Sequence, residues 1–155
     1  NIEAATAEKA AFDEAVAKVP PDAMMNLNTS QDLLAVATLV LDARLAEANG
    51  NRPACVTAWM KAVIAEDKLA YDEPPAWYYP VRESLGGAML RAARPILAET
   101  VFRRDLERNP DNGRSLFGLA EALKMQKKDA EAAVVMEKFK KAWARADVPA
   151  TIAGL

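Results

Sequence analysis

Two adjacent carboxylates, Asp72 and Glu73, are the side chains of this sequence whose pairing most directly indicates chemistry. Glycoside hydrolysis uses two carboxyl groups, one as an acid and the other as a base or nucleophile, on opposite sides of the scissile bond. Successive residues of an extended segment point to opposite faces, however, so this pair does not converge on one substrate. No residue is therefore assigned a catalytic role, and an enzyme or small-ligand site between Asp72 and Arg82 is the weakest of three functional hypotheses.

The composition excludes several other kinds of site. The sequence has no histidine, which removes the usual general base, the Ser-His-Asp triad and most catalytic metal sites. Cys55 is the only cysteine, so neither an internal disulfide nor a cysteine zinc cluster can form. We interpret Cys55 as a small buried side chain. No metal ion and no cofactor are predicted.

Charge and hydropathy exclude two classes of partner. The 20 basic and 22 acidic residues are interspersed and leave a net charge of −2, so no basic surface is expected for nucleic acid or anionic lipid. The longest apolar run, residues 33–41, is too short to insert across a membrane. The chain begins at Asn1 without a methionine, which we interpret as a fragment or a processed product. The compartment stays open.

The segment around the acid pair, "YDEPPAWYYPVR", is rich in proline and aromatic residues. The favoured interpretation is structural: the prolines stiffen a long connection, and the aromatic rings cover the seam between two helical elements. The alternative is that the segment lines a ligand pocket. The residues of this insertion platform are Tyr71, Asp72, Glu73, Trp77, Tyr78, Tyr79 and Arg82.

An internal period of 34 residues organises the second half of the chain. The matched pairs are Leu85 with Leu119, Gly86 with Ala120, Ala98 with Ala132, and Phe102 with Met136. Each unit has a small residue on its first helix, a second small residue on its second helix, and a large apolar residue one turn later. Small residues are needed where two antiparallel helices touch, and the large residue fills the gap toward the next pair.

A third copy lies upstream, with Ala43, Cys55 and Trp59 at the same internal spacing. Gly50 is expected in the turn between its two helices, and Pro53 suits the first turn of the second helix. The offset from this copy to the next is 43 rather than 34 residues. The additional residues fall in the segment rich in proline and aromatic residues, which is therefore an insertion between two helical repeats.

The sequence predicts one all-α domain of stacked antiparallel helix pairs, with about seven helices. Thr29 and Asp32 are expected to cap the second helix. The expected helices are residues 3–19, 31–49, 52–68, 76–92, 95–108, 112–127 and 129–146. The expected organisation of residues 1–155 is an N-terminal helix and linker (1–30), a repeat (36–68), the insertion (69–78), two further repeats (79–112 and 113–146, the second with a capping helix) and a tail (147–155).

The pattern resembles that of tetratricopeptide repeat (TPR) proteins over about residues 36–146. The stretches "YDEPPAWYYPVRESLGGAMLRA" and "NPDNGRSLFGLAEAL" are similar to the C-terminal part of bacterial TPR proteins without an assigned activity. The resemblance implies a right-handed α-solenoid whose concave groove binds a peptide or a partner protein. Two positions depart from the family, since Arg82 replaces a large apolar residue and Asp105 a small one.

A concave groove is expected to take its side chains from the first helix of each repeat. One interpretation is a mixed-charge peptide groove in which Arg91 and Arg114 bind a carboxylate through paired hydrogen bonds. The other is a solvated polar face, although Phe117 and Met125 add apolar surface that suits recognition. The predicted groove residues are Arg44, Glu47, Glu83, Arg91, Arg114, Phe117, Glu121, Lys124 and Met125.

The favoured function is a non-catalytic protein–protein interaction module that binds a peptide or a partner protein. The principal alternative is a structural module that packs on its own N-terminal repeats and binds nothing else. The last helix is charged enough to cap the stack, but Trp143 is left for contact with missing repeats or with a second copy of the chain.

Overall fold

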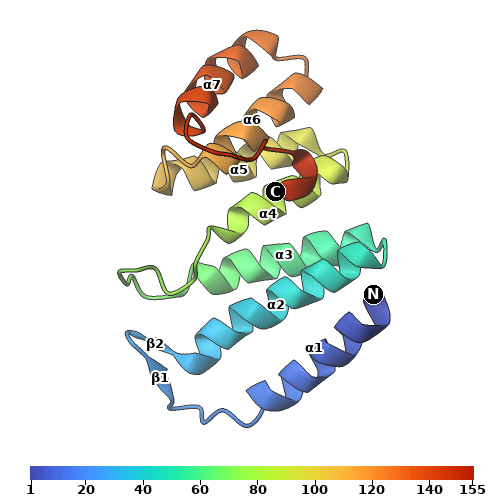
Figure 1. The fold of residues 1–155 in the computed structure, drawn as a ribbon, viewed down its shortest axis with the longest axis vertical. Helices are drawn as coiled ribbons and strands as arrows, with labels where there is room; N and C mark the ends of the chain where they lie inside the picture. The colour runs from blue at the N-terminus through green and yellow to red at the C-terminus, as the bar shows by residue number, and fades with distance from the viewer. The chain divides into compact units, whose positions relative to one another are not determined.

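The computed structural model describes all residues 1–155 and is almost entirely helical (Figure 1). A two-stranded antiparallel ribbon and one 3-10 turn are the other regular elements. The elements are α1 (Ile2–Val16), β1 (Met24–Met25), β2 (Asn28–Thr29), α2 (Ser30–Ala48), α3 (Arg52–Glu66), α4 (Val81–Arg91), α5 (Pro95–Arg108), α6 (Gly113–Met125), α7 (Asp129–Ala142) and η1 (Ile152–Gly154). The predicted all-α architecture with seven helices is confirmed.

The chain forms two compact units, Asn1–Val81 and Arg82–Leu155. Unit 1 contains α1, the ribbon, the α2–α3 pair and the insertion that follows α3. Unit 2 contains α4 after its first residue, then α5, α6, α7 and η1. Short connections join consecutive helices such as α2 and α3, or α6 and α7, and these pairs pack as antiparallel neighbours.

The core of unit 1 lies between α2 and α3, where Ala43 and Trp59 are completely buried. Gly50 turns the chain between the two helices with φ of +71°, a conformation that glycine adopts without strain. Pro53 lies in the first turn of α3, where its missing N–H costs no helical hydrogen bond. Cys55 is buried on the same helix. The predicted turn and the small residues at this helix contact are confirmed.

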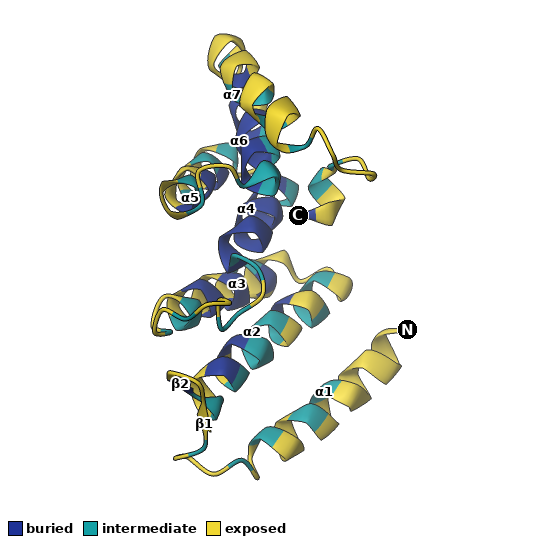
Figure 2. Ribbon diagram, turned by 60° about the vertical axis from the view of Figure 1, so that its left-hand side comes forward, coloured by how far each residue is buried: buried dark blue, intermediate teal, exposed yellow.

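Helix α1 contributes little to this core, because none of its residues is buried (Figure 2). It is tied to α2 by Lys9, whose Nζ lies 2.6 Å from a carboxylate oxygen of Asp13 and 3.1 Å from one of Asp42. Ion pairs of this kind add little stability when water reaches them. The attachment of α1 is therefore weaker than the packing of α2 on α3.

The short ribbon before α2 was not predicted from the sequence. Its turn includes Asn26, whose positive φ of 53° is one that asparagine tolerates better than most residues. The ribbon leads directly into the cap of α2, where Thr29 accepts a hydrogen bond from the main-chain N of Asp32 at 3.1 Å. The predicted capping role of Thr29 and Asp32 is confirmed.

The predicted start of α4 was wrong by several residues. The helix begins at Val81 rather than at residue 76, so the irregular segment extends over residues 67–80. Pro80 disfavours the helical conformation at the residue before it. The main-chain N of Val81 donates to both carboxylate oxygens of Glu66, each at 3.1 Å, and this bond fixes the helix start. Helices α1 and α7 also end earlier than predicted, at Val16 and Ala142.

The core of unit 2 is centred on Phe102 of α5, which is completely buried. A Cβ atom on Gly86 of α4 would lie 2.4 Å from the phenyl ring, and one on Gly118 of α6 would lie 2.2 Å from it. These two glycines therefore let α4 and α6 both approach α5 closely. The other small residues of the 34-residue period are buried as well: Ala98, Ala120 and Ala132. The predicted use of small residues at the helix contacts is confirmed.

Candidate functional site

A buried cluster of polar side chains joins α5 to the beginning of α6. Its centre is Asp105, which is only 1% exposed. One carboxylate oxygen accepts hydrogen bonds from Ser115 Oγ at 2.5 Å and Asn112 Nδ2 at 2.8 Å, and the other accepts from Asn109 Nδ2 at 3.0 Å. Burial of a carboxylate is tolerated when hydrogen bonds replace its water. These donors explain how an aspartate can be buried at this position of α5.

Glu83 of α4 extends the same cluster. Its Oε1 accepts from Asn112 Nδ2 at 2.8 Å, and its Oε2 accepts from Arg114 Nε at 2.6 Å. Burial raises the pKa of Glu83 above its ordinary value, the bonds from Asn112 and Arg114 oppose that rise, and the carboxylate of Asp105 adds to it. The cluster holds the Arg114 guanidinium in one orientation and leaves its Nη2 for another acceptor.

That acceptor belongs to the tail. Beyond α7 the chain runs back across unit 2, so that η1 lies beside α4 (Figure 1). Arg114 Nη2 donates to the carbonyl oxygen of Gly154, and Arg91 Nη1 donates to that of Ile152 at 2.7 Å. Thr151 caps the turn by accepting a hydrogen bond from Gly154 N at 3.1 Å. Both arginines that were predicted to bind a carboxylate thus bind main-chain carbonyl groups of the tail.

The side chain of Leu155 completes this attachment. It is 1% exposed, and a Cβ atom on Gly87 of α4 would lie 2.6 Å from the Leu155 Cβ and 2.9 Å from Arg91 Nη1. The two adjacent glycines of α4 therefore have different roles, Gly86 toward Phe102 and Gly87 toward the tail. Sequence reasoning missed Gly87 and Leu155, although a second glycine inside a helix is a signal of close approach.

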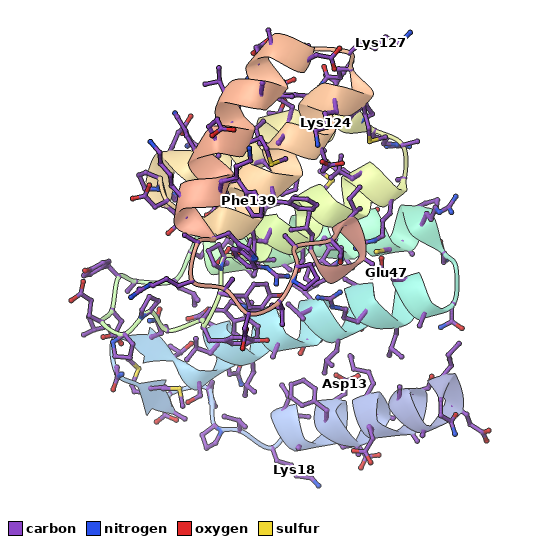
Figure 3. The ribbon with its side chains drawn as sticks, turned by 45° about the horizontal axis from the view of Figure 1, so that its top comes forward. Asp13, Lys18, Glu47, Lys124, Lys127 and Phe139 are labelled. Atoms are coloured by element: carbon purple, nitrogen blue, oxygen red, sulfur yellow. The ribbon has the colours of Figure 1, made fainter.

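Trp143, which follows α7, holds the first part of the tail. Its Nε1 donates to the carbonyl oxygen of Val148 at 2.8 Å. The indole lies against Gly113, where an added Cβ would come within 2.5 Å of the ring. It also stacks on Phe139 at 5.8 Å between ring centroids, and Phe139 points toward α6, where Phe117 lies 5.5 Å away (Figure 3). Trp143 thus packs on its own chain through Gly113, Phe139 and Val148 and is half-buried there.

The predicted groove residues fall into separate groups. The structure brings Glu83, Arg91 and Arg114 together around the tail. Further along α6, Lys124 pairs with Glu121 at 2.7 Å, and Met125 is exposed. Phe117 of α6 lies against Phe139. The other two predicted residues belong to unit 1. There Arg44 lies 3.7 Å from Glu47 and 5.1 Å from the centre of the Trp59 ring.

The insertion is fastened at both ends to other parts of unit 1. At its beginning, the main-chain N of Ala70 donates to Asn28 Oδ1 at 2.7 Å, and Asn28 Nδ2 donates back to the Ala70 carbonyl at 3.3 Å. At its end, Glu66 accepts from Val81 N. The asparagine of the ribbon is a residue that sequence reasoning missed, and it lies 42 positions from its partner.

The aromatic residues of the insertion mainly contact one another. The ring centroids of Trp77 and Tyr78 are 5.2 Å apart, and those of Tyr78 and Tyr79 are 4.8 Å apart. Tyr78 remains 82% exposed, so the platform is only partly buried. Arg82, which was predicted to belong to the platform, is buried and lies in unit 2.

The acid pair of the insertion is engaged within its own turn. Asp72 Oδ1 accepts from the main-chain N of Glu73 at 3.0 Å, and the Tyr71 hydroxyl donates to the Glu73 carboxylate. That bond raises the pKa of Tyr71. Each of the two carboxyl groups is therefore engaged by a neighbouring residue of its own turn.

A second concave feature of unit 2 contains none of the predicted residues. It is a shallow pocket of about 430 Å³ between α5, α6 and α7. Its lining combines apolar side chains, among them Leu106, Leu116 and Leu119, with charged ones, among them Arg103 and Lys138. Nothing in this lining selects a particular ligand.

Comparisons with known proteins identify no relative. No family model, no curated protein and no solved structure matches the chain. Within the structure, no histidine, cysteine, aspartate or glutamate side chains form a group of three that could hold a metal ion. No helix combines the length and the apolar character needed to cross a membrane. The chemistry that the site around Arg91 and Arg114 can carry out is the binding of peptide carbonyl groups.

Proposed function

We propose that unit 2 is a non-catalytic, TPR-like module that binds a short segment of a partner protein at the face formed by Arg91, Arg114 and Gly87. One observation carries the proposal: two arginines donate to main-chain carbonyl oxygens of residues 152 and 154. Carbonyl groups are common to every peptide, so donors that hold this segment are equally suited to a segment of another protein. The glycine adds a position where a side chain can come close to the helix backbone.

The fixed orientation of Arg114 before binding supports this proposal. A surface arginine loses conformational freedom when it binds, and this loss weakens the binding. Arg114 is already held by Glu83, which is in turn held by Asn112. Arg114 therefore loses less freedom on binding than a solvated arginine would.

The repeat pattern gives independent support for a TPR-like module. Helix pairs recur with small residues at their contacts and a period of 34 residues. In proteins of that type the first helix of each pair lines the binding groove. Arg91 lies on α4 and Arg114 on α6, which are the first helices of the two pairs in unit 2.

A second candidate function is purely structural, and the burial of Leu155 favours it. In that case Arg91 and Arg114 serve only to fasten the tail, and the module packs on its own repeats without a foreign partner. The two functions predict different behaviour toward added peptides.

The test is selection of binders from a random peptide library by the full chain, followed by affinity measurements on variants. Arg91→Ala and Arg114→Glu are expected to lower the affinity for the selected peptides about tenfold or more, since each removes a charge-assisted hydrogen bond. Arg104→Ala is the control, because Arg104 is exposed on α5 and pairs only with Glu107. Equal affinities for all three variants, with helical content unchanged by circular dichroism, would exclude the groove.

A further inference from the structure

The tail of this chain occupies the face that the proposed function assigns to a partner. Between Trp143 and η1 most of its residues are exposed. It is held by the bond from Trp143 to Val148, by the two arginine bonds and by the Leu155 side chain. Segments with few buried contacts open more readily than the rest of a fold. The tail can therefore leave the face while α4 to α7 stay folded.

A tethered segment of this kind competes strongly with a free one. The short connection from α7 keeps the tail close to its site, so its effective concentration is on the order of millimolar. A free peptide then binds only the fraction of molecules in which the tail has left, and its apparent affinity falls by that fraction. The strength of the tail contact thus sets how tightly a partner can bind.

The burial of Leu155 beside Gly87 indicates which side chain the face accepts. Leucine is buried there, and the absent Cβ of Gly87 provides the space. Arg91 Nη1 would lie 2.9 Å from that Cβ, so a positively charged residue in place of Leu155 would stand beside a guanidinium. The site therefore selects an apolar side chain and disfavours lysine or arginine.

We propose that residues 151–155 are an intramolecular ligand that closes the site, and that the partner segment displaces them by presenting a leucine-sized apolar side chain to Gly87. The proposal rests on the proposed function, because it assumes that the same face binds a partner. It adds a class of ligand, an uncharged segment of small residues that contains a leucine-sized residue, as in "TIAGL". Gly87 is the residue that lets such a segment approach α4 this closely.

The first experiment measures binding of a fluorescein-labelled peptide, Val-Pro-Ala-Thr-Ile-Ala-Gly-Leu, to the full chain by fluorescence anisotropy. Leu155→Lys is expected to release the tail and to tighten peptide binding about tenfold. Val134→Lys is the matched control, since it also replaces an apolar residue by lysine, at an exposed position on α7. The control is expected to bind the peptide like the unaltered chain.

The second experiment tests the specificity of the opened site. In the Leu155→Lys chain, a peptide with alanine in place of its leucine is expected to bind about tenfold more weakly. Adding Gly87→Ala to that chain is expected to weaken the binding of both peptides, because the new Cβ would lie 2.6 Å from the Cβ atom that leucine and alanine share. Alanine favours helix more than glycine does, so α4 itself is not weakened.

Different outcomes overturn the two proposals. If Leu155→Lys binds the labelled peptide no more tightly than the unaltered chain, or binds leucine and alanine peptides equally, the intramolecular ligand is excluded. The proposed function still stands in that case if library-selected peptides lose affinity in Arg91→Ala and Arg114→Glu. If those peptides are insensitive to both arginines, the proposed function fails as well.

Discussion

The polar cluster at the beginning of α6 and the insertion of unit 1 both gather charged side chains at a connection between helices. In the cluster, both oxygens of Asp105 are paired with donors from three other residues. In the insertion, Asp72 accepts only from its neighbour, and its second oxygen is buried without a partner. The first region is an integral part of the packing of unit 2, whereas the second is a local turn with exposed rings.

This difference concerns how far a side chain is oriented before any ligand binds. A binding side chain must be oriented before the ligand arrives if binding is not to cost conformational entropy. Arg114 meets this condition through Glu83 and the cluster. The insertion holds residues with more obvious chemistry, but nothing orients its two carboxyl groups toward a common ligand. The polar cluster around Glu83 and Arg114 is therefore a better candidate for a binding site than the insertion is.

Of the substitutions proposed here, Phe102→Ala is expected to lower the free energy of unfolding most. The ring is completely buried and contacts the positions of Gly86 and Gly118, so its removal leaves a cavity where α4, α5 and α6 meet. The expected loss is about 3–5 kcal/mol of unfolding free energy, measured by urea denaturation of the full chain. A loss below about 1 kcal/mol would mean that these helices do not pack around this ring.

Asp105→Ala is expected to cost about 2–4 kcal/mol, because it leaves three buried or half-buried donors without their acceptor. Asp72→Ala is the matched control in the insertion and is expected to change stability by less than about 0.5 kcal/mol. Equal effects of the two substitutions, measured in the same denaturation experiment, would remove the distinction drawn between the regions.

The sequence predicted the seven helices and the small residues at their contacts, although the start of α4 was placed several residues too early. These features depend on local propensity and on periodic spacing, which a single sequence displays directly. Gly86 and Ala98 could be assigned because they recur at the same places in successive repeats. The glycine turn at Gly50 and the cap at Thr29 are equally local.

The features that could not be predicted depend on contacts between distant parts of the chain. The ribbon is held by Asn28 through Ala70, and the tail is held by Arg91 through a carbonyl 61 positions away. Neither segment has strong intrinsic propensity, so its conformation is decided by the partner it meets. The buried pairing of Glu83 was also missed, since the sequence marked it only as one of several groove charges.

Trp77→Ala tests the insertion itself. Replacing a fully buried tryptophan by alanine lowers the free energy of unfolding by about 3–5 kcal/mol. Trp77 is half-buried against two tyrosines, so the expected loss is about 1–2 kcal/mol. Tyr78→Ala, at an 82% exposed position, is expected to stay within about 0.5 kcal/mol. If thermal denaturation shows no loss for Trp77→Ala either, the rings do not stabilise unit 1, and a ligand role for the platform gains weight.

The smallest expected change in stability comes from replacing Glu99 of α5, and this change depends on pH. Lys128 Nζ, Arg103 Nε and Gln126 Nε2 each donate to its carboxylate at 2.8 Å. The bond from Lys128 is the main cause that lowers the pKa of Glu99 to about 2, and burial opposes it. Because the pKa is lower in the folded state, the stabilisation is complete above the ordinary value of 4.5 and is lost as the pH falls toward 2.

Glu99→Gln is therefore expected to flatten the acid limb of the stability curve, by on the order of 1 kcal/mol between pH 5 and pH 2 once solvent screening is considered. Glu137→Gln is the control: its pKa is also lowered by a lysine, Lys140, but both side chains are exposed and their interaction is screened by water. An acid limb as steep in Glu99→Gln as in the unaltered chain would mean that this ionised carboxylate does not help to hold α5 to the chain around the α6–α7 connection. In that case only the cluster around Asp105 and the apolar core would distinguish unit 2 from the insertion.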